Sequence, residues 1–128
     1  MRVEVRTAID ELGRQFPEAT ITSREDGNGG AYVLMDGMKL GPRYQPDTTW
    51  VGFHLTPQYP YADIYPVFVG ADVTRADKAP FVPPVTPGHV FEGRQAIQVS
   101  RRNGAAQTLS QRATAKILKI LSYLETMP

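Results

Sequence analysis

The side chains able to do chemistry in this 128-residue chain are few, and their spacing excludes several familiar sites. The chain has no cysteine, which excludes disulfides, zinc–thiolate sites, iron–sulfur clusters and a cysteine nucleophile. Its histidines, His54 and His89, lie 35 positions apart without an adjacent carboxylate pattern, so we expect no metal site and no other cofactor. No serine stands in the Gly-x-Ser-x-Gly elbow of hydrolases; the serines are Ser23, Ser100, Ser110 and Ser122.

Two further groups of residues favour turns over catalysis. The glycines in the segment 27–30 are followed by a predicted strand, whereas a phosphate-binding loop needs a helix there, so they predict a hairpin turn. Four aspartates fall near predicted strand ends and loops, where we expect solvated turn carboxylates: Asp47, Asp63, Asp72 and Asp77.

Charge is unevenly distributed along the chain, although the net charge is only +1. Residues 90–128 carry six basic side chains and two acidic ones; the basic ones are Arg94, Arg101, Arg102, Arg112, Lys116 and Lys119. Such a segment can face an acidic protein or a phosphate backbone, or it can form a solvated helix face. No aromatic residue interleaves with these charges between Arg94 and Lys119, which argues against nucleic-acid binding.

The elements that must position these residues follow from hydrophobic periodicity. Apolar residues at helical spacing predict an amphipathic helix over 2–16, stopped by Pro17. Strands are predicted over 19–24, 31–40, 48–56 and 66–70, and in the third of these Val51, Phe53 and Leu55 share one face. The proline-rich segment 71–95 predicts a long irregular loop.

After this loop we expect a brief extended piece at 96–100, a polar loop, and a second helix. Thr108 and Gln111 have the spacing of a capping box at the start of that helix. Its predicted buried stripe is Leu109, Ala113, Ile117, Ile120, Leu121 and Leu124, with Lys116 and Lys119 in later turns where a cation suits the helix dipole. The order helix, antiparallel meander, loop, helix predicts an α+β fold.

Composition agrees with one globular domain over residues 1–128, since 41% of residues are hydrophobic and 21% charged. No apolar run approaches the roughly 18 residues of a membrane span, and the N-terminus lacks the apolar block of a signal peptide. We therefore expect a cytoplasmic protein without a membrane partner.

One segment carries a more specific signal. Between the third and fourth predicted strands the chain reads Tyr59-Pro60-Tyr61, followed by Tyr65-Pro66. A Tyr-Pro-aromatic triplet and a second proline site between two strands resemble the E2 ubiquitin-conjugating (UBC) family, and the order of elements agrees along nearly all the chain. The resemblance implies a UBC-like fold, with Tyr59, Pro60, Tyr61 and Pro66 as structural residues. It also implies a ubiquitin-like protein and an E1-like adenylating enzyme as partners.

The departures from this family define the functional question. The family places a His-Pro-Asn triplet about ten residues before its catalytic cysteine, and only His89 matches here. Counting ten or eleven residues forward from His89 gives Val99 or Ser100, so the first hypothesis is an oxyester at Ser100 with His89 as base. Arg101, Arg102 and Asn103 would then stabilise the oxyanion or hold the carboxyl tail of the ubiquitin-like protein.

Two other interpretations stay open. The likeness to cysteine-less prokaryotic E2-like proteins goes with the oxyester hypothesis. The chain is also similar to ubiquitin E2 variants (UEV), which implies an inert adaptor that binds a ubiquitin-like protein or a partner enzyme noncovalently. Such an adaptor would use the exposed side of the sheet, with Trp50 and His54, and the proline-rich loop. The last interpretation is an unrelated small α+β binding module.

Overall fold

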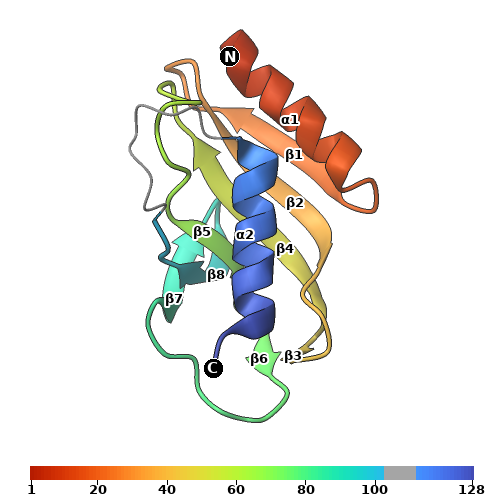
Figure 1. Ribbon diagram of the computed structural model, residues 1–128. Helices are drawn as coiled ribbons and strands as arrows, with labels where there is room; N and C mark the ends of the chain where they lie inside the picture. Colours follow the sequence, from red (N-terminus) through yellow and green to blue (C-terminus); the bar gives the residue numbers. More distant parts are fainter. Residues whose placement is uncertain (103–111) are drawn as a thin grey trace.

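The computed structural model describes residues 1–102 and 112–128, in which two helices cover one face of an antiparallel sheet (Figure 1). The elements are α1 (Val3–Gln15), β1 (Thr20–Glu25), β2 (Ala31–Lys39), β3 (Tyr44–Gln45), β4 (Thr48–Leu55), β5 (Val67–Gly70), β6 (Thr74–Arg75), β7 (Val85–Phe91), β8 (Arg94–Val99) and α2 (Ala113–Thr126). The α+β class with a helix at each end is therefore confirmed.

The main sheet has six strands in the order β1-β2-β4-β5-β8-β7, and all neighbouring pairs are antiparallel. Its first four strands form the meander that the sequence predicts. The short strands β3 and β6 pair separately at one end of the molecule. Alternation along β4 places Val51, Phe53 and Leu55 in the core with no exposed surface, which confirms the predicted face.

The core lies between this sheet face and the two helices. Helix α1 buries Val5, Ala8 and Leu12, which recur at helical spacing, and it ends at Gln15, ahead of Pro17. Helix α2 crosses the same face of the sheet and contributes Ile117 to the same cluster (Figure 1). Among residues 1–102 and 112–128, no helix lies on the other sheet face, called the outer face below.

The prediction of a long irregular loop over 71–95 is wrong for residues 85–95, whereas residues 71–84 carry only the two-residue strand β6. Residues 85–99 form a hairpin, β7–β8, and β8 extends the sheet by pairing with β5. The prolines are compatible with it because Pro80, Pro83 and Pro84 precede the hairpin. Pro87 lies on the edge strand β7, beside a register shift between Thr86 and His89, where a missing backbone donor is tolerated.

The second helix begins at Ala113, and the position expected for Lys116 is wrong. Lys116 lies in the first turn of α2, and its side chain is buried. The predicted capping pair, Thr108 and Gln111, falls outside the described residues, as do Leu109 and Asn103. Within the described residues, neither helix is long and apolar enough to cross a membrane.

Candidate functional site

Residues 56–66, called the Tyr-Pro segment below, connect β4 to β5 and contact residues at the starts of both helices. Tyr59 is only 7% exposed, and its hydroxyl accepts a hydrogen bond from the backbone amide of Ala113, 3.1 Å away. Arg2, just before α1, donates from its guanidinium to the carbonyls of Pro57 and Tyr59. Burial raises the pKa of Tyr59, so the hydroxyl stays neutral in this role. The segment is thus held between the starts of the two helices.

The other residues of the motif, Pro60, Pro66 and Tyr61, occupy different positions in the fold. Pro60 follows Tyr59 directly, and Pro66 is the residue before β5, a position where proline removes no central ladder bond. Tyr61, in contrast, is 59% exposed. The two tyrosines of the triplet therefore differ in role: one is an internal anchor and the other presents its ring to solvent.

The residues after β8 return to this segment. The guanidinium carbon of Arg102 lies 3.8 Å from the ring centre of Tyr65, and that of Arg101 lies 4.0 Å from the ring centre of Tyr123 on α2. Both distances are within the range of cation–π contacts. Two arginines that the sequence analysis proposed as tail-binding residues thus rest on aromatic rings from two different elements.

Arg102 and the Tyr-Pro segment together line an open depression of about 600 Å³. Its lining residues are Gln58, Tyr61, Ala62, Asp63, Tyr65 and Arg102. A guanidinium is suited to a carboxylate, the Gln58 amide can pair with a peptide main chain, and the tyrosine rings offer flat packing surfaces. The depression therefore has the chemistry to hold an extended peptide that ends in a carboxylate. We call it the Arg102 depression.

Ser100 and His89 are not brought together by the sheet register. His89 pairs with Ala96, and Ser100 lies four residues further along the β8 direction, which corresponds to roughly 13 Å at about 3.3 Å per residue. His89 contacts the Thr86 hydroxyl at 3.1 Å, whereas the Ser100 hydroxyl accepts a hydrogen bond from Gln98 at 2.5 Å. A general base must reach the proton it abstracts. The register therefore contradicts the pairing of His89 with Ser100, and Asn103 lies outside the described residues.

The outer sheet face is occupied by side chains of the β7–β8 hairpin. The ring of Phe91 lies over Gly52, so close that a Cβ at Gly52 would come within 2.6 Å of it, and it stacks on Phe68 at 5.1 Å. Trp50 lies beneath Phe91 and Arg94, with its ring 6.2 Å from the Phe91 ring. The sheet surface that an adaptor would use is therefore already covered in part by the chain itself.

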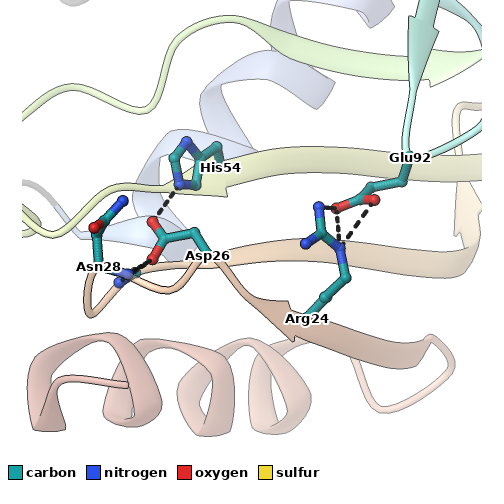
Figure 2. Close-up of polar contacts among 6 residues, drawn as sticks. Arg24, Asp26, Asn28, His54 and Glu92 are labelled. Carbon is teal, nitrogen blue, oxygen red and sulfur yellow. Dashed lines mark hydrogen bonds and ion pairs between the residues drawn. The ribbon is translucent and has the colours of Figure 1, made fainter.

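Two polar contacts secure this arrangement at the β1 side (Figure 2). Arg24 on β1 donates to Glu92 in the β7–β8 turn at 2.9 Å, which ties the hairpin tip across the sheet. Nearby, the buried carboxylate of Asp26 contacts His54 Nε2 at 2.8 Å and accepts a hydrogen bond from the backbone amide of Asn28, also at 2.8 Å.

The Asp26 contacts define its charge state. The hydrogen bond with His54, followed by those from the backbone amides, lowers the pKa of Asp26. Because they join the β1–β2 turn to β4, they stabilise the fold rather than form a site.

Sequence reasoning missed three residues around the Arg102 depression. Asp63 was expected to be a solvated turn carboxylate, but its side chain is 6% exposed and forms an ion pair with Lys116. Tyr65 was identified only as part of the motif, and Tyr123 was not singled out. The sequence held one signal for the ion pair of Asp63: its partner Lys116 follows Ala113 by three positions and so falls on the buried stripe of α2.

Comparison of the chain with protein-family models, with curated proteins and with solved structures found no match.

Proposed function

We propose that this chain is an E2-like module of a prokaryotic ubiquitin-like conjugation pathway and binds the carboxyl tail of a ubiquitin-like protein noncovalently. The observation that carries the proposal is the Arg102 depression, where a guanidinium held on the Tyr65 ring faces an open surface lined by the Tyr-Pro segment. Helix α1, the four-stranded meander, helix α2 and the Tyr59-Pro60-Tyr61 triplet support the E2-like assignment; the β7–β8 hairpin stands where the resemblance implies a long loop. An E1-like adenylating enzyme is the partner that this pathway implies.

The noncovalent form of the proposal is favoured over an oxyester at Ser100. A serine hydroxyl is a weak nucleophile that needs an adjacent base, and strand pairing places His89 about four residues away along the sheet. The arginines need no such partner to bind a carboxylate. This makes the proposed protein an adaptor, in the manner of the UEV proteins that it resembles.

The binding test uses a short dye-labelled peptide that ends in glycine with a free carboxylate, and the same peptide as its amide. We expect the free carboxylate to bind more tightly, because only it forms a charge-assisted contact with Arg102. Arg102→Ala should weaken binding by about tenfold or more, the equivalent of one such contact. The matched control is Arg14→Ala, an exposed arginine at the end of α1. Equal binding of both peptides, or no binding, would contradict the proposal and favour an unrelated binding module.

A second experiment separates the adaptor from the acyl carrier. The protein is incubated with an E1-like enzyme, its ubiquitin-like protein and ATP, and the products are separated with thiol reductant present. The adaptor gives no covalent adduct. An adduct that hydroxylamine cleaves and that Ser100→Ala abolishes would instead establish the oxyester.

A further inference from the structure

A buried cation lies directly behind the Arg102 depression. The side chain of Lys116, in the first turn of α2, is 3% exposed. Its Nζ donates to Asp63 Oδ1 at 3.1 Å and to the backbone carbonyl of Arg101 at 2.7 Å. Asp63 is itself one of the residues that line the depression. One ammonium group therefore joins three separate segments: α2, the Tyr-Pro segment and the chain that leaves β8.

Fold stability alone is a weak explanation for this arrangement. Removing two charges from water costs much of what their attraction returns, and well-packed apolar residues often replace a buried ion pair without loss of stability. A lysine on an otherwise apolar stripe of α2 is thus better explained by what its ammonium holds in place. What it holds is the carbonyl of the residue next to Arg102.

The position of that carbonyl controls the two arginines. Consecutive Cα atoms are about 3.8 Å apart, so fixing the Arg101 carbonyl also fixes where the Arg102 side chain leaves the backbone. From that point Arg102 reaches the ring of Tyr65, and Arg101 reaches the ring of Tyr123. Asp63 completes the arrangement because it orients the ammonium from the loop side.

We infer that Lys116 is a positioning residue for the Arg102 depression: it acts through the Arg101 carbonyl and Asp63 to hold Arg102 where a tail carboxylate binds. The inference rests on the proposed function for its binding consequence. Its structural consequence, the placement of the two arginines on their rings, is measurable in the free protein. The structural consequence and the binding consequence can therefore be refuted separately.

The test compares three variants with the unchanged protein. Lys116→Met keeps the length and removes the charge. Lys116→Met combined with Asp63→Asn removes both charges of the ion pair, and it replaces the single variant if that variant fails to fold. Lys119→Met, an exposed lysine on the same helix, is the matched control.

The first measurement is the proton NMR shift of the Arg101 and Arg102 side chains in the free protein. An aromatic ring moves the resonances of protons above its face, so both arginines should show displaced shifts in the unchanged protein and in Lys119→Met. In the Lys116 variants we expect these shifts to return to ordinary values, while the resonances of the β4 core are unchanged. The second measurement is affinity for the glycine-ended carboxylate peptide, which should fall about tenfold in the Lys116 variants and stay unchanged in Lys119→Met.

Displaced arginine shifts that persist in a folded Lys116 variant would overturn the inference. So would an unchanged peptide affinity in a variant that has lost the shifts. If the unchanged protein binds no peptide, the proposed function fails, and the arginine shifts alone decide whether Lys116 is a positioning residue.

Discussion

Tyr59→Phe should destabilise the protein through the start of α2. The residue before the helix, Arg112, provides no side-chain cap, and the first helical amide, that of Ala113, donates to the Tyr59 hydroxyl instead. Both residues are buried, so water has no ready access to replace the lost acceptor. The substitution leaves the ring packing unchanged and removes only the oxygen. Tyr59 therefore replaces the usual N-cap side chain from elsewhere in the sequence.

The magnitude follows from this geometry. A buried donor left without its acceptor costs about 1–3 kcal/mol, and loss of a helix cap costs about 0.5–2 kcal/mol. We expect a loss near 1.5 kcal/mol, because removing a buried hydroxyl offsets part of the penalty. For a chain of this length the expected fall in Tm is roughly 4–8 °C.

The assay is urea unfolding followed by far-UV circular dichroism, with Tyr61→Phe as control. Both substitutions remove one hydroxyl from the same triplet, but Tyr61 is exposed, so its loss should stay within about 0.5 kcal/mol. A Tyr59→Phe protein as stable as the unchanged one would refute the role of Tyr59 as the cap of α2. Equal losses in the two variants would refute it as well.

Three further predictions concern the rest of the fold. Gly52→Ala should lower the free energy of unfolding in urea by about 1–3 kcal/mol, because the new Cβ would meet the Phe91 ring. Adding Phe91→Leu should recover part of that loss, and strictly additive effects in the double variant would argue against the contact. The pKa of Asp26 is lowered in the folded protein, so Asp26 contributes stability at pH values above its ordinary pKa of 3.8, and this stability is lost as the pH falls through the lowered pKa. The urea midpoint of Asp26→Asn should therefore depend less on pH between pH 2 and 7 than that of the unchanged protein. An unchanged pH profile would count against the pair with His54. Burial raises the pKa of Tyr44 above its ordinary 10.0, so its contribution to stability is complete below pH 10.0 and is lost as the pH rises through the raised pKa. Tyr44→Phe should reduce this loss of stability at alkaline pH. A pH profile identical to that of the unchanged protein would refute the prediction.

Local patterns were sufficient for the elements with strong periodicity. The stripe of Val5, Ala8 and Leu12 and the alternation in β4 predict both the element and its buried face, because burial follows the same period as the backbone. The β7–β8 hairpin was missed for a physical reason. Pro87 lies on an edge strand beside a register shift, and neither feature is visible until the strand order is known.

Part of the candidate site was also proposed from the sequence, and part of it depends on the packing of separate elements. Arg101 and Arg102 were proposed from the sequence because they follow Ser100 at the position where the E2 resemblance implies the active site, and guanidinium groups suit a carboxylate tail. Their partners, Tyr123 and Tyr65, depend on how α2 packs beside the Tyr-Pro segment, which no local pattern encodes. The pairing of Ser100 with His89 was derived from spacing along the chain, and strand register overrules such spacing. The assignment to an E2-like pathway stays a proposal that rests on the order of elements and the Tyr-Pro triplet.

The most direct test of tail binding in the Arg102 depression is a ¹H–¹⁵N NMR titration with the glycine-ended carboxylate peptide. We predict saturable shifts confined to the depression, at Gln58, Tyr61, Ala62, Tyr65 and the Arg102 side chain, and much weaker shifts with the peptide amide. Shifts that map instead to the outer sheet face around Trp50, or that are identical for the two peptides, would contradict it.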